Sequence, residues 1–197
     1  MGRTKAQQSA DTRARLIAVA TRLFAEHGYA ATSTEMVVRE AGTTRGALYH
    51  QFRDKRELFV AVFEEAERQI TWRVALAAAS AGNRWEQFTA GCSAFLDASM
   101  EQVMRQVLLV DGRVVLGVEE WRRIMVGHGL GMTQAALEGL MAEGTIDEQP
   151  AEPLALLVMA LLDEAAINAA SSPDPQAARA QMGAVVARLL HGLRCER

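Results

Sequence analysis

The segment from Ser33 to Phe52 constrains the fold of this chain more than any other stretch of its 197 residues. Its pattern predicts two short helices joined at Gly42. Ser33 or Thr34 is suited to cap the first helix, because a hydroxyl can accept a hydrogen bond from a free amide of the first turn. Glycine takes a positive φ without steric cost, so we expect Gly42 to end this helix.

The second short helix is expected to begin after Thr43 or Thr44 and to have two different faces. Helical spacing directs three apolar residues toward the core: Ala47, Leu48 and Phe52. It leaves five residues exposed: Thr44, Arg45, Gly46, Tyr49 and His50. Two short helices in this order form a helix-turn-helix, whose second helix enters the major groove and presents its N-terminal residues to base edges. The segment therefore predicts DNA binding.

Charge is distributed unevenly along the chain. The net charge of −3 would by itself argue against a nucleic-acid partner. Residues 1–56, however, carry a balance of +5, and the rest of the chain carries −8. A basic module joined to an acidic body is the electrostatic pattern expected of a phosphate-binding head attached to a part that avoids DNA.

Composition indicates an all-α protein. Half of the residues are hydrophobic, Ala and Leu outnumber the β-branched and aromatic types, and there are only 4 prolines. The two cysteines, Cys92 and Cys195, imply no disulfide framework. The N-terminus lacks the apolar core of a signal peptide, and the longest apolar run, Leu154 to Leu162, is too short to span a bilayer. We expect a cytoplasmic protein with no membrane contact.

Amphipathic spacing predicts longer helices on both sides of the two short ones. One runs from about Asp11 to His27, after loose polar residues 1–9, and is ended by Gly28. Another is capped by Asp54 and runs from Lys55 to about Ala79. This second helix would link the basic head to the acidic body.

The remaining pattern predicts a helical body. Helices are expected over residues 85–100, 101–110, 118–143, 154–170 and 176–193. Segment 113–117 is either a short strand or a buried connector, and the glycines at 127, 129 and 131 leave open whether 118–143 is one helix or two. The last two helices are apolar nearly all round. This favours a four-helix bundle made by two copies of the chain, the alternative being burial within one copy.

Residues 10–70 resemble the TetR/AcrR family of bacterial transcriptional regulators. The resemblance rests on Leu16, Ala20, Leu23, Phe24, Gly28, Ala41, Gly42, Thr44, Arg45, Gly46, Leu48, Tyr49, Phe52, Lys55 and Leu58. It implies a flexible basic N-terminus at 1–9, a DNA-binding domain at 10–70 with its motif at 33–52, and an effector-binding and dimerisation domain at 71–197. It also implies a homodimeric repressor that binds double-stranded DNA at a palindromic operator and is released by a small-molecule effector.

The same resemblance assigns roles to residues of the head. Facing the bases would be Thr44, Arg45, Gly46 and Ala47, and contacting the phosphates would be Tyr49, His50 and Lys55. Arginine can bond guanine through two donors, and glycine lets the helix approach closely. Further candidate contacts are Ser33, Thr34, Thr43 and Gln51.

Three residues depart from the usual family pattern: Val38, Thr43 and Gln51. Gln51 can still donate to a phosphate, whereas the other two are expected to alter the packing of the short helices. Four basic residues near the N-terminus are candidates for minor-groove or phosphate contacts, the alternative being a solvated tail: Arg3, Lys5, Arg13 and Arg15.

An effector pocket in the body would need apolar walls with a few polar groups. The candidate lining residues are Phe63, Trp72, Phe88, Phe95, Met104, Trp121, Met125, Met159 and Asp163. Methionine adapts to irregular ligand shapes, which suits it to such a pocket. The alternative is that each of these residues belongs to the core.

No pattern of catalytic or metal-binding residues stands out. The four histidines lack metal-ligand spacing, no glycine loop suits a phosphate, and no Ser or Cys lies in a nucleophile context. We therefore expect no enzymatic activity, no metal and no cofactor. The functions left as alternatives are a helical small-molecule-binding protein or enzyme with a vestigial helix-turn-helix, and a ligand-dependent activator.

Overall fold

The computed structural model describes residues 4–195, apart from the side chains of Met125 and Val126. All the elements in this part of the chain are helical. They are α1 (Lys5–Ala31), α2 (Thr34–Glu40), α3 (Arg45–Gln51), α4 (Lys55–Ala79), α5 (Arg84–Ala98), the π-helix η1 (Met104–Asp111), α6 (Gly112–Met125), the π-helix η2 (Val126–Leu130), α7 (Gly131–Ala142), α8 (Ala151–Ala170) and α9 (Pro175–His191). The expected all-α fold is confirmed.

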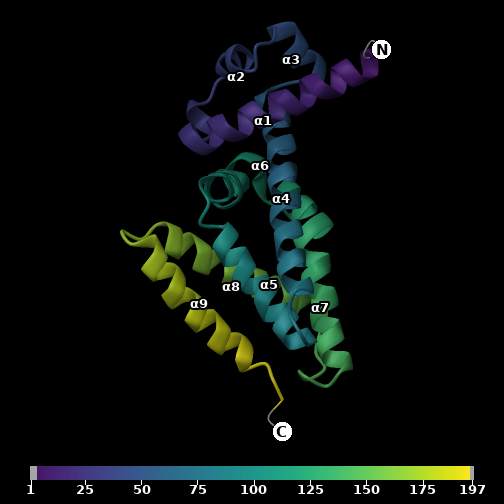
Figure 1. Cartoon of the computed structure of the whole chain (residues 1–197), viewed down its shortest axis with the longest axis vertical. Coiled ribbons are helices and arrows are strands. Elements are labelled where there is room, and N and C mark those ends of the chain that lie inside the picture. Colours follow the sequence, from purple (N-terminus) through teal and green to yellow (C-terminus); the bar gives the residue numbers. More distant parts are fainter. Residues whose placement is uncertain (1–3, 196–197) are drawn as a thin grey trace.

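The molecule has a small head and an elongated body (Figure 1). Helices α1, α2 and α3 form the head, and α4 runs from the head along the length of the body. Helix α5 packs along the far part of α4, α7 packs against α5 and α8, and α8 and α9 form a helical hairpin beside α5. The segment η1–α6 lies between the head and the rest of the body, in contact with both α1 and α4.

The predicted caps of α2, α3 and α4 are confirmed, whereas α1 kinks at Gly28 and continues to Ala31 rather than ending at the glycine. The side chains of Ser33, Thr44 and Asp54 each accept a hydrogen bond from the amide three residues further on, at 3.2, 3.2 and 2.7 Å. Gly42 takes a φ of 57° and ends α2. These caps satisfy amides that would otherwise lack a partner, and they set the angle between α2 and α3.

The first helix begins earlier than the sequence pattern predicts. Thr4 caps α1: its hydroxyl accepts from the Gln7 amide at 3.2 Å, and the Gln7 side chain accepts from the Thr4 amide at 2.8 Å. Residues 5–9 are therefore helical, and the expectation of a loose segment is wrong for them; residues 1–3, including Arg3, lie outside the described residues. A reciprocal polar cap leaves no trace in the hydrophobic pattern, which explains the difference.

The middle of the chain also differs from expectation. The helical path continues through Gly112 without a break, because η1 passes directly into α6. A Cβ at Gly112 would lie 2.5 Å from the ring of Phe63, so glycine here serves close packing on α4. Residues 113–116 are helical, so neither a strand nor a connector forms there, and the chain kinks at Gly117, where φ is 76°. In residues 118–143 the π-helix η2 joins α6 to α7 with no residue between them, so the helical path is continuous and only its winding changes at the glycines.

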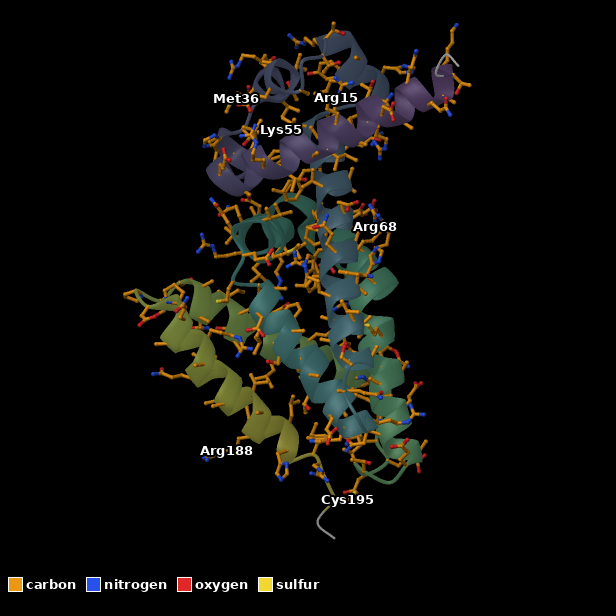
Figure 2. All side chains as sticks on the ribbon, viewed as in Figure 1. Arg15, Met36, Lys55, Arg68, Arg188 and Cys195 are labelled. Atoms are coloured by element: carbon orange, nitrogen blue, oxygen red, sulfur yellow. The ribbon has the colours of Figure 1, made fainter. Side chains whose placement is uncertain are left out.

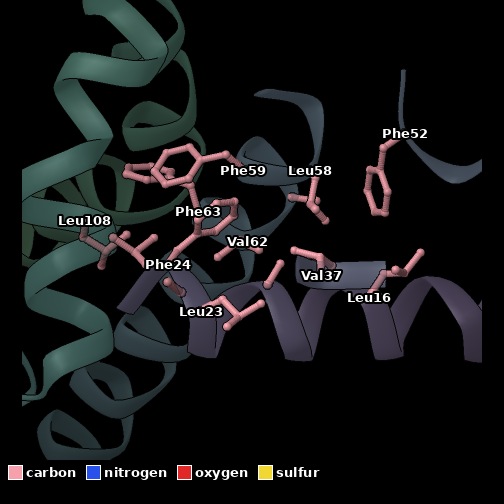
Figure 3. Close-up of a cluster of buried hydrophobic side chains, with 14 of the residues drawn as sticks. Leu16, Leu23, Phe24, Val37, Phe52, Leu58, Phe59, Val62, Phe63 and Leu108 are labelled. Atoms are coloured by element: carbon pink, nitrogen blue, oxygen red, sulfur yellow. The ribbon is translucent and has the colours of Figure 1, made fainter. Parts of the chain in front are cut away.

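Two clusters of buried side chains hold the protein together. The first joins the head to α4, η1 and α6, and Figure 3 shows Phe24, Phe59, Phe63 and Leu108 within it. The rings of Phe24 and Phe59 pack edge to face, with centroids 5.3 Å apart. The second cluster joins α5, α7, α8 and α9. The predicted domain boundary at residue 70 stays a prediction, since buried residues on both sides of it share the first cluster.

Helix α8 is longer than the apolar run that marks it in the sequence. Among the described residues it is the one helix long and apolar enough to cross a membrane by length and composition, with a mean hydropathy of 1.6. Buried residues make up 44% of the apolar window, and the helix packs against α5, α7 and α9. Core helices of folded proteins pass the same test, so this property indicates burial as readily as a membrane.

Gly28 is expected to be indispensable at the kink within α1. Its φ of 76° and ψ of 167° lie in a region that only glycine adopts easily, so Gly28→Ala should lower the free energy of unfolding by about 1–3 kcal/mol. Gly46 has no positive φ and lies within α3, so Gly46→Ala should leave stability unchanged or raise it by up to about 1 kcal/mol. Urea denaturation measures the free energy of unfolding of both variants. Equal effects of the two substitutions would contradict the conclusion that the positive φ of Gly28 requires glycine.

Candidate functional site

Helix α3 presents an exposed face on a firmly held base. Leu48 and Phe52 are fully buried in the first cluster, as the pattern predicts, and Ala47 is half-buried. Thr44, Arg45, Gly46, Tyr49 and His50 are all exposed. Because the buried side chains fix the helix while its outer face stays free, the geometry suits docking into a groove.

Arg45 is the most available cation of this face. Its side chain is 70% exposed; Nη1 lies 3.6 Å from Oε1 of Glu35, and the guanidinium lies 5.5 Å from the ring centre of Tyr49. The Glu35 carboxyl accepts hydrogen bonds from its own backbone amide and from the Ser33 hydroxyl, and these bonds, together with the nearby charge of Arg45, lower its pKa. Exposed ion pairs are weak, so Arg45 can leave Glu35 for a base at little cost.

The turn between α2 and α3 closes in spite of the unusual residues there. The Thr43 amide donates to the carbonyl of Val38 at 3.1 Å, and the Gly42 amide donates to that of Arg39 at 3.3 Å. This pattern is the ordinary closure of a helix end by glycine. Val38 packs against the first cluster. The two departures from the family pattern thus fit within a regular turn.

Two predicted phosphate contacts are engaged inside the head. Lys55 Nζ donates to the carbonyls of Tyr29 and Thr32 at 2.8 and 3.0 Å, and lies 4.1 Å from the ring centre of Tyr29. Gln51 Nε2 donates to Ser9 Oγ at 2.7 Å. Lys55 therefore ties α4 to the end of α1, and Gln51 ties α3 to the start of α1. A phosphate contact stays a prediction for both.

The remaining head candidates differ in accessibility. Thr34 is buried, with 9% of its surface exposed, so a DNA contact through its side chain gains no support. Lys5, Arg13 and Arg15 are exposed along α1, and the Arg13 guanidinium lies 4.5 Å from the centre of the Phe52 ring. Figure 2 shows Arg15, Met36 and Lys55 in the head, at the opposite end of the molecule from Arg188 and Cys195.

The body contains a cavity of about 190 Å³ walled by residues of α4 to α8. Five of the predicted lining residues belong to its wall: Phe88, Phe95, Trp121, Met159 and Asp163. Gly129, Met132 and Ala136 form further parts of the wall. The cavity is largely apolar, with a few polar groups, as a site for a small organic molecule requires.

Three other predicted lining residues lie elsewhere. Phe63 and Met104 are buried in the first cluster, beneath the head, because the helices carrying them face α1 at those positions. Trp72 lies on the outer side of α4 and is 64% exposed. The side chain of Met125 lies outside the described residues.

Two buried carboxyl groups face this cavity. Asp163 was predicted, and its Oδ2 accepts from Nη2 of Arg113 at 2.9 Å. Glu67 was not predicted; 6% of its surface is exposed, and no described residue donates a hydrogen bond to its carboxyl group. Arg113 also lies over the ring of Trp121, 4.6 Å from its centre.

The signal for Glu67 was its position on α4. It stands among acidic residues that indicate a solvated surface, yet it lies one helical turn after Phe63 and three residues before Ile70, both buried. A carboxyl group on the apolar face of a helix indicates a functional site, since burial of an unpaired charge is costly.

Burial changes the titration of both carboxyls. Burial raises the pKa of Glu67 to about 7, and the nearby charge of Asp163 adds to the effect. Burial also raises the pKa of Asp163, to about 6, although Arg113 opposes this by attraction and hydrogen bonding. The cavity therefore holds two acids that gain their charge close to neutral pH. The other charged group in its wall is Arg84.

Glu67 should make stability depend on pH. The folded state binds a proton more tightly than the unfolded state, whose pKa is near 4.5, so the free energy of unfolding falls as pH rises from about 4.5 to about 7. Glu67→Gln stays neutral and should be more stable than the parent at pH 8, by up to roughly 3 kcal/mol, with the difference vanishing near pH 4.5. Urea denaturation at both pH values measures this. Glu65→Gln, on the outer side of α4, is the matched control. A stability difference between Glu67→Gln and the parent that does not change with pH would contradict the raised pKa of Glu67.

Known proteins match both parts of the chain. The family described as bacterial regulatory proteins, tetR family, matches residues 16–62, and the family described as tetracyclin repressor-like, C-terminal domain, matches residues 85–193. The regulator AcrR of Shigella flexneri is 40% identical over 70 residues, which are 36% of this chain and 33% of AcrR. The chain thus matches about a third of the length of that relative.

Solved structures extend the match to the whole chain. A TetR-family transcriptional regulator from Pectobacterium atrosepticum is 35% identical, with a TM-score of 0.84, over 98% of this chain and 99% of that one. RolR, solved in complex with resorcinol, is 21% identical, with a TM-score of 0.69, over 92% of this chain and 90% of RolR, and shows the fold alone. The helix-turn-helix head, the helical body and these matches lead to one conclusion: the chain belongs to the TetR family of DNA-binding transcriptional regulators.

Proposed function

We propose that the protein is a homodimeric repressor that binds a palindromic operator through α3 and is released when a small molecule enters the cavity. The observation that carries this proposal is the free outer face of α3, held on buried Leu48 and Phe52. The description of the matching C-terminal family as repressor-like supports the direction of control. Its place would be the cytoplasm, where the operator of a bacterial regulator lies.

The DNA contacts follow from the order of residues on α3. Arg45, at its first position, bonds guanine through two donors, and Gly46 lets the backbone approach the bases. Tyr49 and His50, one turn further, bond phosphates. Exposed Thr44 and five half-buried candidates assist in this contact: Ser33, Thr43, Ala47, Gln51 and Lys55. The DNA-binding domain spans residues 10–70 in this proposal, and residues 71–197 form the regulatory domain.

The dimer forms through α8 and α9. Leu156, Leu157, Val185 and Leu189 are between 40% and 69% exposed on this hairpin. Their exposure in a single chain argues against the alternative in which one copy buries both helices by itself. A second hairpin related by a two-fold axis would cover them in a four-helix bundle. Two recognition helices could then reach half-sites about 34–36 Å apart or a multiple of that spacing.

The cavity communicates with the head through η1 and α6. The Tyr29 amide, at the end of α1, donates to Oδ2 of Asp111 at 2.8 Å, and Arg56 Nη2 donates to the carbonyl of Leu116 at 2.9 Å. Arg113 and Trp121 of the same segment line the cavity. A ligand that binds one arrangement of this segment more tightly than another would shift the head accordingly. RolR with resorcinol shows that this fold can hold a small molecule.

Loss of Arg45 should weaken operator binding. Arg45→Ala removes a bidentate base contact, so affinity for the DNA upstream of the protein's own gene should fall by about ten- to a hundredfold. Fluorescence anisotropy at fixed salt measures this. Arg68→Ala, in the body and paired with Glu65, removes the same charge and should change affinity little.

Two results would count against the DNA-binding proposal. Unchanged affinity for both Arg45→Ala and Tyr49→Phe would show that α3 does not contact DNA as assigned. Binding of no duplex more tightly than random DNA at physiological salt would favour the alternative of a ligand-binding protein with a vestigial head. Increased transcription from a target promoter when the protein binds would favour an activator.

Leu189→Asp should separate the dimer. An aspartate at the centre of the apolar four-helix bundle would bury an unpaired charge. Sedimentation should therefore show monomers, and the helix content of the chain should be unchanged. Leu76→Asp is the matched control: Leu76 is 53% exposed on α4, against 55% for Leu189, and lies outside the proposed interface. A dimer that withstands Leu189→Asp would place the interface elsewhere.

A further inference from the structure

We infer that the cavity binds an organic cation, a molecule with an apolar body and one ammonium group, whose charge lies between Glu67 and Asp163 and displaces Arg113 from Asp163. The inference rests on the proposed function, because it names the chemical class of the effector. It starts from the charges that the wall of the cavity holds.

The cavity has one negative charge more than it can neutralise. Its charged lining residues are Glu67, Arg84, Arg113 and Asp163. Arg84 is paired with Glu143, which lies outside the cavity wall. Arg113 is paired with Asp163, so no described cation neutralises Glu67. An ionised carboxyl in an apolar cavity is costly, and a cationic ligand would remove that cost.

Arg113 shows that a cation fits beside these carboxyls. Its guanidinium lies 2.9 Å from Asp163 and 4.6 Å from the centre of the Trp121 ring, so it is held by charge and by an aromatic face together. An ammonium group prefers the same two partners. The side chain of Arg113 is 51% exposed, so it can move into solvent when a ligand takes its place.

Other ligand classes suit the cavity less well. A carboxylate ligand would add a third negative charge beside Glu67 and Asp163. A neutral alcohol or phenol could hydrogen-bond either carboxyl, but it would leave the excess charge in place. Hydrogen bonds between a cation and a carboxylate are about twice as strong as neutral ones. The walls, which include Phe88, Phe95 and Val158, require an apolar body on the same molecule.

Displacement of Arg113 would act directly on the contacts that hold the head. Arg113 follows Asp111 by two residues, and Asp111 accepts the amide of Tyr29 at 2.8 Å and Nε2 of Gln106 at 3.1 Å. On the other side of Arg113, the carbonyl of Leu116 accepts from Arg56. The start of α6 is thus bonded to Asp163 on the cavity side and to α1 and α4 on the head side. Loss of the ion pair between Arg113 and Asp163 would free the start of α6, which carries the contacts with α1 and α4.

Three probes with one apolar body test the ligand class. Phenylbutylamine is a cation at pH 8, phenylbutanol is neutral and phenylbutyrate is an anion, while their size and shape are nearly the same. Isothermal titration of the full chain at pH 8 should show that the amine binds at least about tenfold more tightly than the alcohol, since a charge-assisted hydrogen bond adds about that much. The acid should bind more weakly than both.

Variants of α4 locate the charge that the amine meets. Glu67→Gln removes the charge but keeps the size of the side chain and one acceptor oxygen, so the amine should lose at least about tenfold in affinity while the alcohol is unaffected. Glu65→Gln, on the same helix but outside the cavity wall, should leave all three probes unchanged. The inference is overturned if the alcohol or the acid binds as tightly as the amine, if none of the three binds, or if Glu67→Gln retains the amine.

Operator binding separates this inference from the proposed function. The amine should lower operator affinity of the parent, and Arg113→Gln, which lacks the ion pair with Asp163, should lower it without any ligand. An amine that binds through Glu67 but leaves operator affinity unchanged would support the cation site and overturn the effector role. Release of the operator by the alcohol alone would support an effector role and overturn the ligand class.

Discussion

The aromatic contact between α1 and α4 is the constraint on which the rest of the structure depends. Phe24 packs on Phe59, and Phe63, one turn further along α4, continues the same cluster toward η1 and α6. Gly112 is needed beside Phe63 because any side chain there would collide with the ring. The head therefore rests on the top of the body through close packing, and a shift of η1 or α6 cannot be absorbed locally. Dense packing makes such a contact able to transmit a change of position.

The sequence predicts the head well because its signals are local. Caps, the positive-φ glycine and the amphipathic split of α3 all lie within a few residues of one another, and each is confirmed. The body was harder, because the glycines at 112 and 117 have opposite roles. One permits close packing inside a continuous helical path, and the other kinks the helix. Only the partner helix distinguishes these roles, and no spacing along the chain reveals it.

The sequence predicts the residues of the candidate site only in part, for the same reason. Aromatic and methionine residues of the body are numerous, and composition alone could not separate Phe88 and Phe95, which line the cavity, from Phe63, which belongs to the core. The polar groups of the cavity come from residues that lie far apart in the sequence. Arg113 meets Asp163 from 50 residues away, and Glu67 joins them from α4. Glu67 stands in an acidic run in the sequence, and only its helical spacing from Phe63 and Ile70 distinguishes it from the more exposed acidic residues beside it.

Two features leave the single chain incomplete, and each indicates the chemistry of what completes it. The α8–α9 hairpin exposes leucine and valine side chains, which cost free energy in water and which an identical apolar face would cover. The cavity holds a carboxyl group without a partner, which an apolar surface cannot satisfy and a cation can. In the dimer that we propose, a second copy of the chain covers the exposed face of the hairpin permanently. Occupation of the cavity depends on the concentration of a ligand, so in our proposal the cavity serves as the switch while the dimer remains intact.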